Sequence, residues 1–130
     1  MNKLAIVTFA VASAAAALTM SVVPSYARGT CKDVYVQAVN NTGKRIKVID
    51  MDYVIDGYGT KSEPVRNEEI PAGKPWAKTR NLEQASGRIT TIIVKYRVSK
   101  SGFTKWTSVK KAYSTGSVCN SGGSYSLTLN

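Results

Sequence analysis

Residues 88–98 read Arg-Ile-Thr-Thr-Ile-Ile-Val-Lys-Tyr-Arg-Val, the clearest strand signal in the chain. β-Branched and aromatic side chains dominate this stretch, and such side chains favour the pleated, half-buried surface of a sheet. Ser-Lys-Ser-Gly at 99–102 is a loop sequence, and residues 103–113 continue in an extended pattern. The stretch therefore predicts a pair of antiparallel strands joined by a four-residue loop.

Two further extended runs precede this pair. Residues 33–39 alternate between apolar and polar, and Asn-Asn-Thr-Gly at 40–43 has turn chemistry that leads into a run starting at Lys44. The sequence predicts a hairpin there. The apolar positions change parity between Val48 and Ile49, and because a one-residue insertion produces such a change, we expect a β-bulge at this point.

The rest of the chain carries short strands and turns, and its one helical candidate is brief. Gly-Tyr-Gly at 57–59 ends the second run. The other segments are, in order, a polar surface excursion at 60–69, a turn at 70–75, a strand at 76–82, a loop or single helical turn at 81–87, and a last strand at 124–130. Six or seven short strands without a substantial helix predict an all-β fold, a small antiparallel β-sandwich or barrel.

The N-terminal segment has the features of an export signal. A short positive start precedes a largely apolar run at 4–23, and Ser25-Tyr26-Ala27 has small residues at the positions that a signal peptidase reads. We expect residues 1–27 to be removed and residues 28–130 to form a single β domain in the periplasm or outside the cell. A retained membrane anchor is the alternative, because the apolar run is long enough to span a bilayer.

Two cysteines, Cys31 and Cys119, lie near the two ends of the expected mature domain. An exported protein meets an oxidising environment, and neither cysteine has a nearby histidine or a Cys-x-x-Cys partner that would indicate a metal site or a reactive thiol. We therefore predict a structural disulfide. Closing a loop of this length stabilises the fold by about 4 to 5 kcal/mol in the chain-entropy model.

Charge is distributed unevenly along the chain. There are 18 Lys and Arg residues, 8 Asp and Glu residues and no histidine. Every acidic residue lies at or before Glu83, whereas residues 84–130 contain seven basic residues and no acidic one, a net charge of +7. Removing residues 1–27 takes away only Lys3, so the mature domain keeps 17 basic and 8 acidic residues, a net charge of +9. A charge of this size favours anionic partners.

The basic residues of the predicted hairpin fall on one face of it. With a four-residue loop, Val98 pairs with Phe103, and Lys95 then lies opposite Trp106. The predicted anion-binding face consists of Lys95, Arg97, Lys100, Trp106 and Lys110. The opposite face is predicted to be core and consists of Ile92, Val94, Tyr96, Val98, Phe103 and Val109. The alternative is a solvated strand face that has no ligand.

The residues that usually carry catalysis are missing or poorly placed. Without histidine, zinc sites and Ser-His or Cys-His catalysis lose their usual ligand or base. Glu68 and Glu69 are adjacent and would point to opposite faces of a strand, and no glycine-rich phosphate loop precedes a helix. We predict a protein that is not an enzyme and needs no cofactor.

Three aspartates on the second extended run share a parity and supply oxygens of the kind that calcium binds: Asp50, Asp52 and Asp56. Alternate side chains on a strand lie about 6 to 7 Å apart, which is too far for one ion. We therefore predict no metal site. These carboxylates are expected to form ion pairs on neighbouring strands instead, with Arg45, Lys47 or Arg80.

Three kinds of function fit these features. The leading hypothesis is an exported, non-enzymatic binding protein that engages lipid headgroups, an acidic polysaccharide or an acidic protein through the basic hairpin. Peripheral contact with a membrane fits this hypothesis, and nucleic acid is not an expected partner. The second is a periplasmic immunity protein or inhibitor of a toxin or hydrolase, with contact loops at 57–69 or 71–80. The third is a secreted effector or membrane-active toxin.

Overall fold

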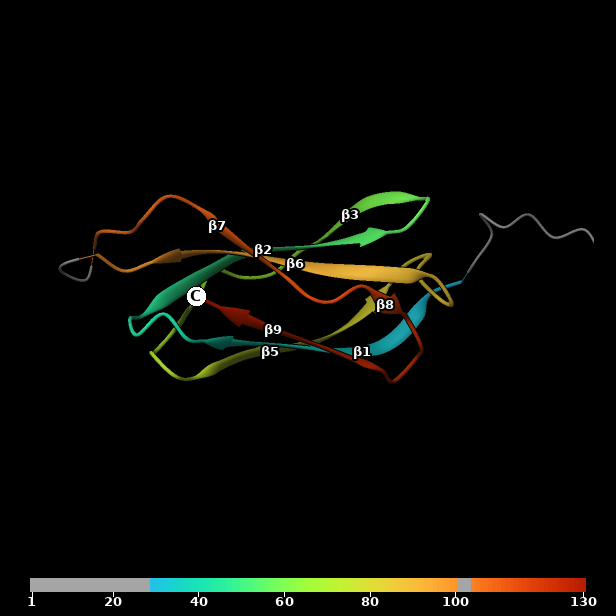
Figure 1. The fold of residues 1–130 in the computed structure, drawn as a ribbon, viewed down its shortest axis with the longest axis horizontal. Coiled ribbons are helices and arrows are strands. Elements are labelled where there is room, and N and C mark those ends of the chain that lie inside the picture. Colours follow the sequence, from blue (N-terminus) through green and yellow to red (C-terminus); the bar gives the residue numbers. More distant parts are fainter. Residues whose placement is uncertain (1–28, 101–103) are drawn as a thin grey trace, which may run out of the picture.

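Two β-sheets pack face to face in the computed structural model, which describes residues 29–100 and 104–130 (Figure 1). The described residues form strands and no helix, so the predicted all-β class is confirmed, and of the predicted sandwich or barrel the two packed sheets form a sandwich. The strands are β1 (Cys31–Asn40), β2 (Ile46–Ile55), β3 (Gly59–Glu63), β4 (Glu68–Ile70), β5 (Pro75–Leu82), β6 (Ile89–Val98), β7 (Lys110–Tyr113), β8 (Ser117–Val118) and β9 (Ser124–Leu129). The expected signal peptide at 1–27 lies outside the described residues.

The smaller sheet has the strand order β5-β1-β9, and the larger sheet has the order β3-β2-β6-β7, with β4 paired to β2 and β8 paired to β6. All of these pairs are antiparallel except β1 and β9, which run parallel. The prediction of a purely antiparallel arrangement is wrong for this pair. The chain enters β9 from β8 in the other sheet, so no hairpin turn fixes the direction of β9 against β1.

The turn at 40–45 carries the chain from one sheet to the other. β1 pairs with β5 and β9, and β2 pairs with strands of the larger sheet, so the predicted hairpin between these two runs is wrong. Asn40 is fully buried, and its side-chain nitrogen donates hydrogen bonds to the carbonyl oxygens of Lys44 (2.7 Å), Ile70 (3.1 Å) and Pro71 (3.1 Å). Turn residues identify the reversal in the sequence, but they do not determine whether the next strand returns to the same sheet.

The second strand has the predicted bulge and more partners than expected. The register between β2 and β6 shifts between Val48 and Asp50, which confirms the bulge at Ile49. The predicted surface excursion at 60–69 is wrong, because most of it forms β3 and β4, both of which pair with β2. Residues 83–88 form turns rather than a helix.

The core lies between the two sheets. The largest fully buried side chains come from both layers and include Trp76 and Leu82 from the smaller sheet and Tyr53, Ile46 and Met51 from the larger sheet. On β6, the predicted core residues Ile92, Val94, Tyr96 and Val98 are buried, as expected. The prediction is wrong for Val109, which is 40% exposed because it precedes β7, and Phe103 lies outside the described residues.

The predicted disulfide between Cys31 and Cys119 is confirmed, with the two Cα atoms 6.2 Å apart. Cys31 begins β1 in the smaller sheet, and Cys119 directly follows β8, which belongs to the larger sheet. Both sulfur-bearing residues are fully buried. The bond therefore joins the two layers at the end of the sandwich where β1 begins.

Candidate anion-binding site

The hairpin that carries the predicted anion-binding face has a different register from the expected one. Lys95 pairs with Lys111, Tyr96 pairs with Lys110, and an isolated bridge joins Ser99 to Trp106. The predicted pairing of Lys95 with Trp106 is therefore wrong. The Ser99–Trp106 bridge places Trp106 further toward the loop than expected, and a register shift of one residue between Trp106 and Lys110 makes Lys111, not Lys110, the partner of Lys95.

Lys95 is neutralised on the outer face of the larger sheet. Its Nζ atom lies 3.0 Å from Oδ2 of Asp52 and 3.4 Å from Oδ2 of Asp50. The hydrogen bond to Asp52 is the main reason that the pKa of Lys95 is raised above its usual value. The expectation that these aspartates pair with Arg45, Lys47 or Arg80 is wrong, because the bulge in β2 brings Asp50 directly opposite Lys95. We therefore exclude Lys95 from the candidate site.

Trp106 is half-buried against two cations that the charge pattern along the sequence did not indicate. Nζ of Lys47 lies 4.5 Å from the centroid of the Trp106 ring, and Cζ of Arg45 lies 5.3 Å from it. These are cation–π distances. Nε of Arg45 is also 3.0 Å from Oε1 of Glu69. The indole and this carboxylate thus hold two positive side chains close to each other.

Arg97 and Lys100 remain beside Trp106, as the sequence predicted. A guanidinium nitrogen of Arg97 donates a hydrogen bond to the carbonyl oxygen of Thr107 (3.0 Å), which fixes the side chain near the loop. Lys100 is exposed in that loop, and its backbone NH donates to the carbonyl oxygen of Lys105 (2.9 Å). Of the five predicted site residues, Arg97, Lys100 and Trp106 therefore lie together, Lys95 shares their face but is paired with Asp50 and Asp52, and Lys110 lies on the opposite face.

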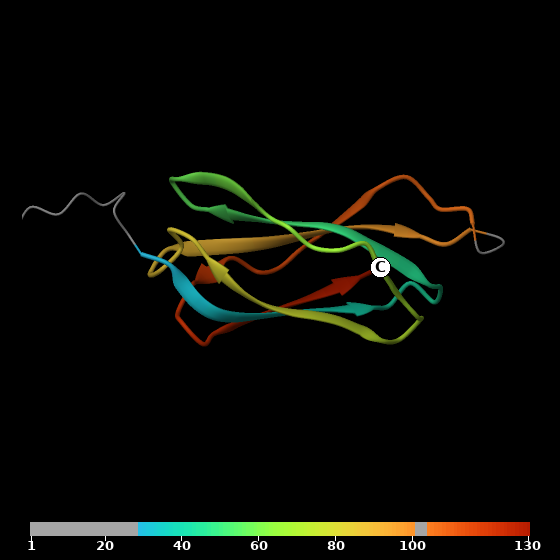
Figure 2. The same cartoon turned by 180° about the vertical axis from the view of Figure 1, so that it is seen from behind.

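Further cations lie at the same end of the sandwich, which we call the basic end (Figure 1, left; Figure 2, right). It comprises the turn at 40–45, the turn before β5, the beginning of β2, the end of β6 and the loop after it. Backbone hydrogen bonds join these segments, from Asn40 to Lys74 (3.0 Å) and from Ser99 to Arg45 (2.9 Å). The basic residues of the basic end are Lys44, Arg45, Lys47, Lys74, Arg97, Lys100 and Lys105.

Few carboxylates balance the basic end. Glu69 is paired with Arg45, and the neighbouring Glu68 is paired with Lys78 (2.8 Å). The turns at the opposite end, at 56–59, 83–88 and 119–123, contain two acidic residues, Asp56 and Glu83, and one basic residue, Arg88. Sequence reasoning missed Lys44, Arg45, Lys47 and Lys74 because they lie in the charge-balanced half of the chain and come next to the hairpin only through the crossing turn.

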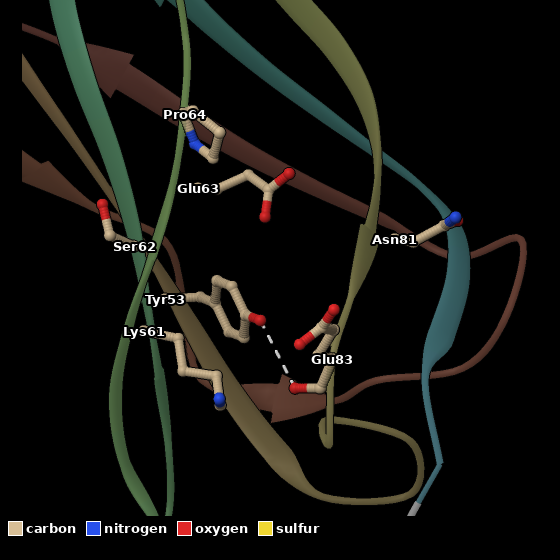
Figure 3. Close-up of a pocket in the computed structure, with 7 residues that line it drawn as sticks. All are labelled: Tyr53, Lys61, Ser62, Glu63, Pro64, Asn81 and Glu83. Atoms are coloured by element: carbon tan, nitrogen blue, oxygen red, sulfur yellow. Dashed lines mark hydrogen bonds between the residues drawn. The ribbon is translucent and has the colours of Figure 1, made fainter.

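Each open side of the sandwich also carries a pocket. The first, of about 530 Å³, lies where β3 and β5 form the edges of the two sheets (Figure 3). The Tyr53 hydroxyl donates a hydrogen bond to the carbonyl oxygen of Glu83 (3.3 Å), and burial raises the pKa of Glu63. We call it the acidic pocket, and its lining residues are Tyr53, Lys61, Ser62, Glu63, Pro64, Asn81 and Glu83.

The second pocket, of about 570 Å³, lies on the opposite side, between β7 and β9. The Tyr96 hydroxyl donates a hydrogen bond to the main-chain oxygen of Asn130 (2.7 Å), and burial raises the pKa of Tyr96. Lys110, which the sequence placed on the predicted anion-binding face, lies here. We call this the basic pocket, and its lining residues are Tyr96, Lys110, Lys111, Ala112, Tyr113, Thr128 and Asn130.

A scan against models of known protein families gave no match, and a search of curated proteins gave no significant match. Within residues 29–100 and 104–130, no three His, Cys, Asp or Glu side chains are grouped so that they could hold a metal ion. The same residues contain no helix with the length and apolar character needed to cross a membrane.

Proposed function

We propose that this protein is an exported, non-enzymatic binding protein of the cell envelope or exterior, and that it engages an anionic partner through the basic end. The observation that carries the proposal is the gathering of seven basic residues at one end of the sandwich, with Arg45 and Lys47 against Trp106. The opposite end has no comparable excess of positive charge.

The arrangement around Trp106 suits an anion because its cations are already in place. Like charges repel, and bringing Arg45 and Lys47 together costs free energy that the ring of Trp106 and the carboxylate of Glu69 offset. Holding the side chains in one geometry before binding reduces the entropy that binding would otherwise cost. In this proposal Trp106 positions the cations, and the cations contact the ligand.

The test compares two charge-matched double variants of the purified protein. Lys47→Gln/Lys100→Gln removes two cations from the basic end, and Lys32→Gln/Lys61→Gln removes two from distant positions. Binding is measured with polygalacturonate and with vesicles containing phosphatidylglycerol, at low and high salt. We expect the first variant to lose at least about tenfold in affinity, roughly 1.4 kcal/mol, and the second to change little.

Two results would contradict the proposal. One is an equal loss in both double variants, which would mean that net charge alone governs binding. The other is an affinity that does not fall with salt, because exposed charges are screened over about 8 to 10 Å at physiological ionic strength.

The second candidate function is a protein inhibitor or immunity protein. The acidic pocket favours it, because residues 61–64 of the expected 57–69 contact segment line that pocket. A pocket with two glutamates suits a basic side chain of a protein partner. This function predicts that the protein captures one protein partner tightly. Glu63→Gln/Glu83→Gln should abolish the capture, and Lys47→Gln/Lys100→Gln should leave it intact. That result would favour the inhibitor function over the leading proposal.

A further inference from the structure

We propose that the anionic partner is an extended acidic polysaccharide and that the basic pocket is its second point of contact. This inference rests on the proposed function of the basic end, and it adds the class of ligand and a second contact site outside the basic end. The chain of the polysaccharide would run from the loop after β6 along the side of the sandwich formed by β7 and β9.

The two contacts are close enough for one ligand chain. Ser99 marks the level of Trp106 on β6, and Tyr96 marks the level of Lys110. Three residues of strand separate these levels, which is about 10 Å at about 3.3 Å per residue. Exposed Lys105 directly precedes Trp106 in the loop after β6, and Thr107, Ser108 and Val109 connect Trp106 to Lys110. We call this path from the basic end to the basic pocket the track, and its cations lie at its two ends.

The cations along this track do not lie in one plane. Lys111 pairs with Lys95, whose side chain is on the outer face of the larger sheet. Lys110 pairs with Tyr96, which is buried, so Lys110 belongs to the opposite face and lines the pocket at the open side between the sheets. A flat bilayer contacts one face of a small domain, whereas a linear polyanion bends from one face to the next.

The basic pocket also has the chemistry that an acidic sugar needs. Its lining residues include no side-chain carboxylate, and they include two lysines and the hydroxyl-bearing Thr128. The ring of Tyr113 is 60% exposed and is therefore accessible to a flat sugar ring. Lysines provide charge for the carboxylates of uronic acids, and hydroxyl and amide groups provide hydrogen bonds for sugar hydroxyls.

The experiment measures the affinity of the purified protein for a galacturonate disaccharide and a galacturonate dodecasaccharide by titration calorimetry. In the wild type we expect the longer chain to bind at least about tenfold more tightly, because it reaches both contacts at once. Lys110→Gln/Lys111→Gln should remove this advantage and leave the affinity for the disaccharide unchanged. Lys47→Gln/Lys100→Gln should weaken the binding of both sugars.

Lys32→Gln/Lys61→Gln is the control, since it removes the same charge and includes Lys61, the counterpart of Lys110 in the acidic pocket. It should retain the advantage of the longer chain. Unchanged urea midpoints show that each variant is folded, since surface substitutions usually change stability by no more than about 0.5 kcal/mol.

Three results would overturn the inference, and they separate it from the proposed function. If Lys110→Gln/Lys111→Gln keeps the length advantage while Lys47→Gln/Lys100→Gln weakens binding, the basic end binds anions and the basic pocket is not a contact. If phosphatidylglycerol vesicles bind more tightly than the dodecasaccharide, the partner is a bilayer. If none of these anions binds the wild type, the proposed function fails together with the inference.

Discussion

The two open sides of the sandwich are built alike and charged differently. On each side an edge strand places a lysine opposite a buried tyrosine of the next strand. Lys61 on β3 lies opposite Tyr53 on β2, and Lys110 on β7 lies opposite Tyr96 on β6. Each tyrosine hydroxyl donates a hydrogen bond to a main-chain oxygen across the gap between the sheets. Because the two sides share this framework, they differ mainly in the charged residues that surround each tyrosine.

Ion pairs close the acidic side. Nε of Arg80 on β5 lies 3.5 Å from Oε1 of Glu63 on β3, and Nζ of Lys78 on β5 lies 2.8 Å from Oε1 of Glu68 on β4. On the basic side such pairs are impossible between the two edge strands, because β9, Ser-Tyr-Ser-Leu-Thr-Leu, has no charged residue. One side therefore pairs its charges across the gap between the sheets, and the other leaves its lysines available to solvent and ligands.

The largest effect on stability is expected from removing the disulfide between Cys31 and Cys119, which joins the two sheets. Cys31→Ala/Cys119→Ala should lower the free energy of unfolding by about 4 to 5 kcal/mol, because the disulfide closes a long loop in the unfolded chain. Urea denaturation measures the loss. A loss confined to one side, seen as faster hydrogen exchange in β3 but not in β7, would contradict the view that the bond supports both.

Removing the two tyrosine hydroxyls is expected to give the next largest loss of stability, and the loss should differ between the two sides. Tyr96→Phe should cost about 1 to 1.5 kcal/mol and Tyr53→Phe about 0.5 kcal/mol, within the usual net value of a hydrogen bond. The reason for the difference is geometry, since 2.7 Å is the preferred O–H···O distance and 3.3 Å is long. Equal costs in thermal or urea unfolding would show that the two hydroxyls contribute alike.

The next prediction concerns the free-energy cost of burying the carboxylate of Glu63 on the acidic side. Burial raises the pKa of Glu63 above its ordinary value of 4.5 even though Arg80 opposes the shift. Since the folded state then disfavours the ionised form, the contribution of Glu63 to stability is most favourable below pH 4.5 and declines as the pH rises through the folded pKa.

Glu63→Gln should therefore gain stability relative to the wild type as the pH rises, by less than about 1 kcal/mol. Urea unfolding of both proteins between acidic and neutral pH measures the difference. A variant that becomes less stable than the wild type on going to neutral pH would show that the pair with Arg80 outweighs the cost of burial.

The smallest effect is expected for the more exposed ion pair. Lys78→Gln should cost about 0.5 kcal/mol or less, because both side chains of the Lys78–Glu68 pair are partly exposed and surface pairs of this kind contribute little. The cost should shrink in high salt. A cost above that of Tyr96→Phe would mean that the acidic side depends on this pair more than its exposure indicates.

Local patterns in the sequence predicted the elements better than their partners. The alternation in residues 88–98 and the parity change at Ile49 report directly on which side chains face the core, so β6 and the bulge in β2 were predictable. The side-chain bonds of Asn40 depend on residues about 30 positions later, which no local pattern contains. The sequence therefore did not predict that the turn at 40–45 crosses between the sheets. It also did not predict that Arg45 and Lys47 lie beside Trp106.

The disulfide was predictable because there were only two cysteines to pair. The register of the β6–β7 pair was not predictable, because it shifts by one residue between the Ser99–Trp106 bridge and the Tyr96–Lys110 pair, and this shift moves Lys110 from the predicted anion-binding face to the basic pocket. Half of the candidate site thus followed from charge along the chain, and the other half required the topology.

The parallel pairing of β1 with β9 has a consequence for the rate of folding. Tyr35 is the register partner of Ser124 and Asn40 that of Leu129, so the first strand needs the final residues of the chain beside it. Contacts between such distant residues slow folding, and domains rich in them fold in about milliseconds to seconds. β1 therefore gains its second neighbour only after residues 124–129 have been made and have packed beside it.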